Sequence, residues 1–211
     1  TESLVTSIEV YGANKEIGIN LVNPLGNTIY NFQHFTGKIG KSSDNKYMSD
    51  NLITALGDWQ ELIDSYQESY STYLISRKTK ISERIVLESE LVTLQGEYDA
   101  IEVTRDSLLD SGLNATEQNT LLKAKLVEIN NKKSNIIAKQ AEIDAIDEEL
   151  QTIQNTVSLT SYFTPSQLLE LDNFDIHTTV TEENYVISSL DTDLDLQNMA
   201  QDLYDRYKRY L

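Results

Sequence analysis

The chain has 211 residues, a net charge of −17 and no cysteine. The acidic balance argues against nonspecific binding to nucleic acid or to an anionic membrane, because both need clustered Lys and Arg. The lack of cysteine excludes a disulfide framework and a thiolate metal site, and no apolar run approaches the roughly 18 residues of a membrane-spanning helix.

Residues 1–46 are expected to form the β-strand part of a small head and a polar connector. Alternating apolar residues over 3–11, and β-branched or aromatic residues over 16–22 and 28–32, predict three strands. Between the last two, the stretch Asn23-Pro24-Leu25-Gly26 has Pro second and Gly fourth, which is typical of a type I turn. We therefore expect those two strands to form a hairpin, and residues 36–46 to lead out of it.

Residues 47–158 predict a long antiparallel coiled-coil hairpin, because they carry two apolar heptad series. The first series follows an N-cap at Ser49 and contains Leu52, Leu56, Trp59, Ile63, Tyr66, Tyr70, Tyr73, Leu87, Leu91, Leu94, Tyr98, Ile101 and Leu108. The second contains Leu122, Ile129, Ile136, Ile143, Ile146, Leu150, Ile153 and Val157. Gly112 suits a left-handed helix end, and Asn114 with Glu117 has capping-box spacing, so the turn is expected near 111–115.

The charges beside these series select a register in which facing residue numbers sum to roughly 226, so that Leu94 faces Lys132 and Leu87 faces Lys139. The acidic stretch 88–106 then lies opposite the basic stretch 123–139, and further from the turn the signs swap between 77–84 and 142–149. Apolar residues should hold the hairpin, since an exposed ion pair contributes about 0–1 kcal/mol and a buried Leu or Ile roughly 1.5–3 kcal/mol.

Two groups of residues depart from this pattern. Arg77, Lys80 and Arg84 occupy seam positions while Leu74, Ile81 and Ile85 lie one step aside, so either the seam rotates locally, which we favour, or a polar layer fixes the register. The second group lies off the seam and could serve a second interface or the head; it consists of Ile75, Val86, Val92, Val103 and Ile137.

Residues 159–211 are expected to complete the head. Thr164, Pro165 and Gln167 combine a capping-box pair with Pro at the first helical position, which predicts a short helix through Leu171. The segment 162–174 should cover the aromatic residues early in the first long helix, and 176–180 and 185–187 could add extended pieces beside the first strands. A final amphipathic helix, capped by Thr192 or Asp193, should carry Leu196, Met199, Leu203, Tyr207 and Tyr210.

The predicted fold is mainly α with a small α+β head, and the strand-like start and helical end of the chain indicate a piece of a longer protein.

No residue is predicted to be catalytic, to bind a cofactor or to bind a metal, so we expect that the chain is not an enzyme. Asp191, Asp193 and Asp195 resemble a calcium loop, but Leu196 replaces the required Gly and Asp202 the final Glu, so capping is favoured. His34 and His177 lack partners at motif spacing. The tyrosine row Tyr66, Tyr70 and Tyr73 could form a sugar-stacking platform, although its spacing favours a packed seam.

Two flanking segments carry a resemblance. The first is Ser7-Ile8-Glu9-Val10-Tyr11-Gly12 with residues 19–23 and 30–32, and the second is residues 163–174 with Thr181-Glu182-Glu183-Asn184-Tyr185. Joined by a helical hairpin, they resemble the middle region of the tail-tip protein of siphophages and prophages of Gram-positive bacteria, the tail-associated lysin or prophage tail endopeptidase family. The likeness covers about the first 35 and last 50 residues.

The resemblance implies a virion structural protein at the phage tail tip, assembled in the host cytoplasm, as part of a larger tail protein. Its expected role is a hub-associated arm or spacer of the baseplate, and its expected partners are other tail proteins and a homotrimer formed through the parent protein. The alternative is a host cell-wall carbohydrate-binding module. Neither nucleic-acid binding nor membrane insertion is expected. Family members often carry cell-wall hydrolase modules, but no catalytic motif of such a module occurs in these residues.

Overall fold

The computed structural model describes residues 4–36, 47–188 and 191–208. It is mainly helical with a small three-stranded sheet and a C-terminal helix, which confirms the predicted fold class. The chain divides into two compact units, one of Thr1–Ile75 with Glu148–Leu211 and one of Ser76–Asp147. Helices α1 (Asp50–Asp110) and α2 (Thr116–Val157) contribute to both units. Within the described ranges, no helix is long and apolar enough to cross a membrane.

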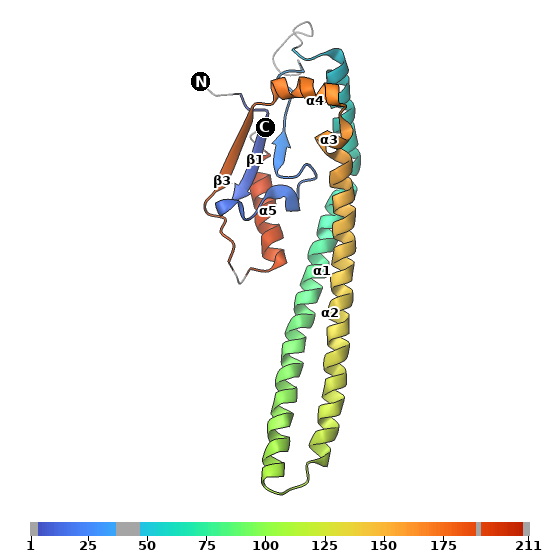
Figure 1. The fold of residues 1–211 in the computed structure, drawn as a ribbon, viewed down its shortest axis with the longest axis vertical. Helices are drawn as coiled ribbons and strands as arrows, with labels where there is room; N and C mark the ends of the chain where they lie inside the picture. The colour runs from blue at the N-terminus through green and yellow to red at the C-terminus, as the bar shows by residue number, and fades with distance from the viewer. Residues whose placement is uncertain (1–3, 37–46, 189–190, 209–211) are drawn as a thin grey trace. The chain divides into compact units, whose positions relative to one another are not determined.

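The sheet of the first unit has β1 (Ser7–Gly12) in its centre (Figure 1). The strand β2 (Thr28–Tyr30) pairs with β1 in antiparallel orientation, with Ile8 opposite Ile29. On the other side, β3 (His177–Glu182) pairs with β1 in parallel, with Val10 opposite Val180. The expected addition of 176–180 beside the first strands is thus confirmed, whereas residues 185–187 form no strand.

The strand predicted over 16–22 is wrong. Positive φ values at Asn14 and Lys15 turn the chain after β1, and the segment forms the short 3₁₀ helices η1 (Ala13–Lys15) and η2 (Ile19–Leu21). Its apolar residues are buried in the core rather than aligned in a ladder. The turn at 23–26 does form, since the Gly26 N–H donates to the Asn23 carbonyl, but the antiparallel partner of β2 is β1.

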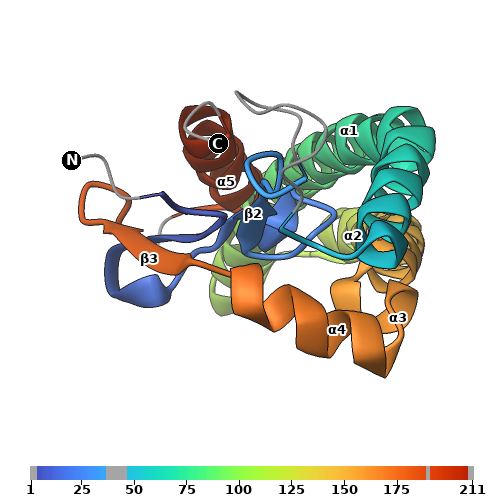
Figure 2. The ribbon, with the colours of Figure 1, turned by 90° about the horizontal axis from the view of Figure 1, so that it is seen from above.

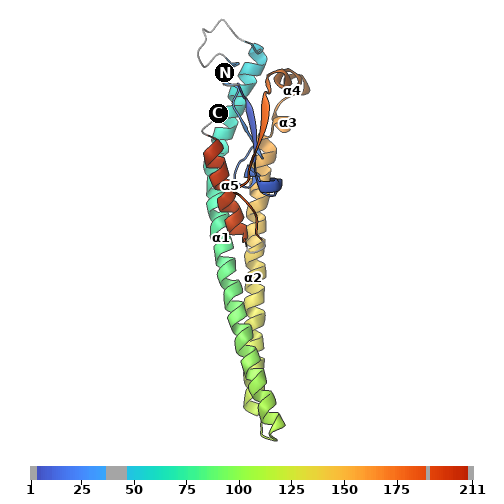
Figure 3. The ribbon, with the colours of Figure 1, turned by 90° about the vertical axis from the view of Figure 1, so that its left-hand side faces the viewer.

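The C-terminal helix α5 (Asp193–Tyr207) packs on this sheet and closes the core. Thr192 caps α5 through a capping box with Asp195, as expected. The Gln197 amide donates a hydrogen bond of 3.1 Å to the Leu74 carbonyl of α1, which lies beside α5 (Figure 3). The fully buried core residues of this cluster are Ile8, Val10, Ile17, Ile19, Val22, Ala200 and Leu203.

After α2, the helices α3 (Leu159–Tyr162) and α4 (Pro165–Leu171) lead the chain through η3 (Asp172–Phe174) toward β3 (Figure 2). The predicted capping box of Thr164 and Gln167 is present. Helix α4 also holds the beginning of α1, because the Glu170 carboxylate accepts hydrogen bonds from the backbone and hydroxyl of Ser49 at 2.6 and 2.7 Å. Ser49 in turn caps α1 by accepting from the Leu52 N–H.

In the second unit, α1 and α2 run antiparallel and side by side (Figure 1). The turn lies where the sequence places it, with Gly112 at a φ of 68° and the Asn114 side chain accepting from the Thr116 N–H. Buried apolar residues of the second heptad series include Leu122, Ile129 and Ile143.

The predicted sign pattern of the cross-helix charges is confirmed, but the register needs a correction. Lys125 contacts Glu97, Lys132 contacts Glu90 and Lys139 contacts Glu83, at distances of 2.9, 2.6 and 2.8 Å. The residue numbers of each pair sum to 222 rather than 226. In an antiparallel coiled coil, unlike heptad positions alternate along the seam. Each lysine therefore contacts a glutamate beside the seam, and not the apolar residue that was predicted to face it.

For the cationic stretch 77–84, the two predicted alternatives, a rotated seam and a polar layer, are each partly correct. Ile81 is fully buried, so the seam does rotate by one step there. The side chains of Arg77 and Arg84 are nevertheless only 16 % and 17 % exposed, and they bond Asp147 and Gln140 of α2. Lys80 pairs with Glu142 at 2.7 Å. A polar layer therefore lies around a single buried isoleucine.

Candidate functional site

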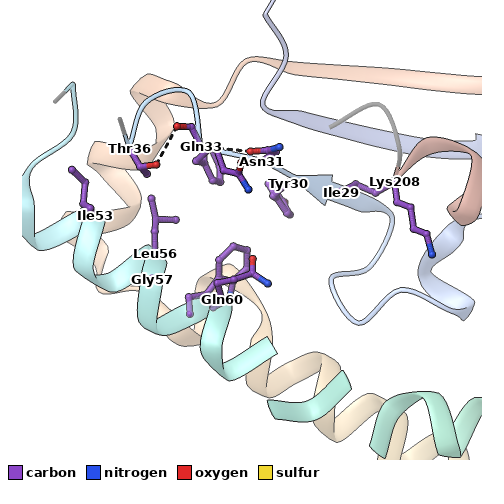
Figure 4. A pocket seen from close by; sticks show the side chains of 12 residues that line it. Ile29, Tyr30, Asn31, Gln33, Thr36, Ile53, Leu56, Gly57, Gln60 and Lys208 are labelled. Atoms are coloured by element: carbon purple, nitrogen blue, oxygen red, sulfur yellow. Dashed lines mark hydrogen bonds between the residues drawn. The ribbon is translucent and has the colours of Figure 1, made fainter. Parts of the chain in front are cut away.

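A hollow of the first unit lies between the end of β2 and the first turns of α1 (Figure 4). Its volume is about 200 Å³. It is lined by Ile29, Tyr30, Asn31, Phe32, Gln33, Thr36, Ile53, Leu56, Gly57, Trp59, Gln60 and Lys208. Apolar and aromatic side chains line it together with the amides of Asn31, Gln33 and Gln60.

Three aromatic rings fix the apolar part of the hollow. Tyr30 stacks on Phe32 with ring centroids 6.0 Å apart and meets Trp59 edge-on at 6.1 Å. Trp59 is held in place because its indole N–H donates to the Val157 carbonyl at 2.7 Å and its ring packs against Phe163 at 5.5 Å. Burial raises the pKa of Tyr30. The expectation that the segment after Val157 covers the early aromatic residues is thus confirmed for Trp59.

Polar groups at the rim come from the loop after β2 and from α1. The Gln33 N–H donates to the Asn31 side chain at 2.9 Å, and the Thr36 hydroxyl donates to the Gln33 carbonyl at 3.2 Å. On α1, the Gln60 amide donates to Asp64 at 2.9 Å. These bonds order the loop while the exposed Gln33 side chain still faces solvent. The rim therefore offers both donors and acceptors.

Gly57 gives the hollow its depth on the α1 side. A Cβ added there would meet no atom within 4 Å. A glycine inside a helix destabilises the helix by roughly 0.8–1 kcal/mol relative to alanine. Nothing in the packing of the chain itself requires this residue, so its visible effect is the open space beside Leu56 and Trp59.

This arrangement suits binding rather than proton transfer. Among the described residues that line the hollow, the one charged group is Lys208, which also pairs with Asp205 at 2.7 Å. No carboxyl or imidazole group occurs among these described lining residues, whereas general acid–base hydrolysis of a glycoside uses two carboxyl groups. A small neutral molecule with one apolar face and several hydroxyl or amide groups would fit an aromatic wall and an amide rim.

The sheet register brings together a polar cluster that sequence spacing could not reveal. Ser7 and His177 are partners on β1 and β3, and Ser7 Oγ lies 3.0 Å from His177 Nδ1. Ser7 donates its proton to Asp175, and His177 Nε2 lies 3.9 Å from Glu9. Because Ser7 is fully buried, no substrate can reach its oxygen, and the cluster joins two strands instead of forming a nucleophilic site.

The other residues weighed in the sequence have structural surroundings. His34 contacts the rings of Phe35 and Tyr47. Asp195 caps α5, and no group of three or more metal-ligating side chains occurs in the described part of the chain. Tyr70 is buried at 2 % exposure, its hydroxyl accepts from Gln154 at 3.0 Å, and burial raises its pKa to about 12. The tyrosine row is therefore no open platform at its centre.

The chain matches no family model, no curated protein and no solved structure.

Proposed function

We propose that this chain is a structural and interaction module of a phage tail tip, an arm or spacer associated with the baseplate hub and part of a larger tail protein. The observation that carries the proposal is the charge-matched hairpin of residues 76–147. Three lysines seven residues apart each hold a glutamate on the facing helix, and Lys80 and Arg77 continue the ladder with the signs exchanged. Such pairing specifies one register over many turns, which is what a spacer needs.

The sequence and the site chemistry support the same role. The resemblance to tail-tip proteins rests on residues 7–12 and 163–174, which form β1 and the region of α4 in the first unit. The hollow beside Trp59 carries no acid–base pair among its described lining residues. A binding and positioning role, without catalysis by this chain, accounts for both features.

The test is the location of the chain in virions. Antibodies raised against the purified chain should label the distal end of the tail when phage particles from the source bacterium are viewed by electron microscopy. The control is the same serum absorbed with the chain. Particles that carry no label at the tail tip, although the serum detects the parent protein in the lysate, would overturn the proposal.

A second candidate function is host carbohydrate binding, and the hollow of Figure 4 favours it over the tyrosine row. Tyr30 offers aromatic surface for a sugar ring, supported from behind by Trp59, which is only 3 % exposed, and Gln33, Asn31 and Gln60 offer amides for its hydroxyl groups. The net charge of −17 excludes purely electrostatic binding to anionic wall polymers. The ligand class expected here is therefore a neutral saccharide.

Gly57→Leu tests this candidate sharply. A Cβ added at Gly57 meets no atom within 4 Å, so the leucine side chain should extend into the hollow, while the loss of glycine favours the helix. We expect binding to cell-wall preparations or to a glycan array to disappear with the melting temperature unchanged or higher. The matched control is Ile137→Leu, far from the hollow in sequence. Equal binding by wild type and Gly57→Leu would exclude this site.

A further inference from the structure

Helix α1 carries a second heptad series on the side away from α2. Within the second unit, this outer face holds nine successive positions spaced four and three residues apart, and none is charged: Thr79, Ser82, Val86, Ser89, Thr93, Gly96, Ala100, Val103 and Ser107. The outer face of a helix in a two-stranded coiled coil usually carries the charged residues that keep it in water. The charge of α1 is instead concentrated beside the seam.

The outer face is exposed, and no described residue of the second unit covers it. Val86 and Val103 are 56 % and 69 % exposed, and Val92 at its border is 68 % exposed. These valines were among the residues that could have served either the head or a second interface. Gly96, in the middle of the face, would have no atom within 4 Å of an added Cβ.

Two hydroxyl groups of the face, on Ser82 and Thr93, have hydrogen-bond partners on their own helix. Ser82 donates to the Lys78 carbonyl at 3.0 Å, and Thr93 donates to the Ser89 carbonyl at 3.2 Å. A hydroxyl that bonds its own helix four residues back can be buried against another helix without losing its partner. Together with Gly96, such residues allow a close approach of a second backbone.

The heptad spacing of the outer face and the charges beside it indicate which kind of partner could pack there. A seam with a repeat of seven fits another helix with the same repeat. One flank of the face carries Glu83, Glu90 and Glu97, whose side chains remain 46 %, 51 % and 51 % exposed although each holds a lysine of α2. The other flank carries Lys78, Ile85, Val92, Asp99 and Asp106, of which the two aspartates lie opposite Thr104 and Ser111 in a parallel pair.

These flanks distinguish the two orientations of a second α1. In an antiparallel pair the glutamate row of one copy would face the glutamate row of the other, which is repulsive. In a parallel pair each glutamate row faces the opposite flank, so that Glu83 meets Lys78 and Glu90 meets Ile85 of the neighbouring copy. The parallel arrangement is thus the complementary one.

We propose that the outer face of α1 is an interface for a second copy of this chain, packed in parallel along residues 79–107. The face is about 42 Å long at 1.5 Å per residue and roughly 10 Å wide, which gives on the order of 800 Å² buried in total for two copies. A stable interface buries about 1,200 Å² or more. The contact alone is therefore weak. It does not depend on a role in a phage tail.

Disulfide trapping tests the contact, because the natural chain has no cysteine to interfere. Ser82→Cys and Val103→Cys, made separately, should each form a covalent dimer under mild oxidation at high protein concentration. In an antiparallel pair only residues near one two-fold axis can meet their own copies, so both variants can self-link only in parallel. Ser134→Cys, exposed on α2, is the control and should stay monomeric.

A charged residue on the outer face of α1 should reduce formation of the disulfide-linked dimer. Val103→Glu placed in the Ser82→Cys chain should reduce the yield of dimer at least severalfold, whereas Ile137→Glu, at a site of equal exposure on α2, should leave it unchanged. Far-UV circular dichroism should show the same helix content in all variants. Yields no higher than that of Ser134→Cys, or dimer from only one of the two cysteine positions, would overturn the proposal.

Discussion

Two isoleucines on α2 test the phase of the hairpin seam. Ile143 is 2 % exposed and Ile137 is 70 % exposed, although they lie six residues apart on the same helix. Ile143→Ala removes three buried carbons, worth about 0.8 kcal/mol each, and leaves a cavity. We expect the free energy of unfolding to fall by about 2–5 kcal/mol. Ile137→Ala removes exposed surface and improves helix propensity, so its effect should lie within about 0.5 kcal/mol of zero.

Urea unfolding followed by far-UV circular dichroism measures both variants. The midpoint for Ile143→Ala should shift to lower urea with an unchanged slope, since the surface exposed on unfolding is nearly the same. The single tryptophan, Trp59, lies in the first unit and reports that unit separately by fluorescence. Similar losses for both variants, or a larger loss for Ile137→Ala, would show that the seam phase is wrong.

Four further outcomes follow from the contacts. Reversing Lys125, Lys132 and Lys139 to Glu should lower the melting temperature measured by circular dichroism, whereas Lys123→Glu with Lys133→Glu, outside the ladder, should not; partial recovery is expected from lysine at Glu83, Glu90 and Glu97. Trp59→Phe leaves the buried Val157 carbonyl without its 2.7 Å partner and should cost about 1–3 kcal/mol in chemical denaturation. Hydrogen bonds from Lys139 and Lys80 lower the pKa of Glu83 and Glu142 below 4.5, so the stability they add is present above pH 4.5 and lost as the pH falls below it; melting curves recorded down this range should show the loss, and Glu83→Gln should reduce it. Gly57→Ala and Gly96→Ala should each raise the unfolding free energy by roughly 0.8–1 kcal/mol, measured with the same urea assay.

The two long helices could be predicted because the heptad pattern persists over many turns and depends only on residues that are near one another in the sequence. Ser49, Gly112 and Thr164 mark helix ends through hydrogen bonds or dihedral angles that involve near neighbours, and these three act as expected. Asn114 also lies at the turn, but its side chain accepts from the Thr116 N–H, whereas a capping box with Glu117 was predicted. The register was less secure. A charge pattern that itself repeats every seven residues is compatible with small shifts, and the cross-helix contacts give sums of 222 for the three lysine–glutamate pairs and 224 for Arg77 with Asp147.

The sheet and the hollow depend on contacts that no local pattern encodes. Residues 16–22 are strand-like in composition, but tertiary burial of Ile17 and Ile19 outweighed β propensity. The pairing of Ser7 with His177 joins residues 170 positions apart. Likewise, Tyr30 and Trp59 were each predicted to lie in regular structure, yet the hollow exists only because the end of β2 approaches α1.

The two glycines inside α1 connect the site with the proposed interface. Neither has a positive φ, and neither has a neighbour that an added Cβ would touch, so folding of this chain alone would favour alanine at both positions. Gly57 opens the hollow beside Trp59, and Gly96 lies at the middle of the uncharged outer face. Each glycine destabilises the helix at a place where the structure leaves room for another molecule. A chain that acted only as a rigid rod would have no use for either, so the glycines favour binding at both places over a purely mechanical role.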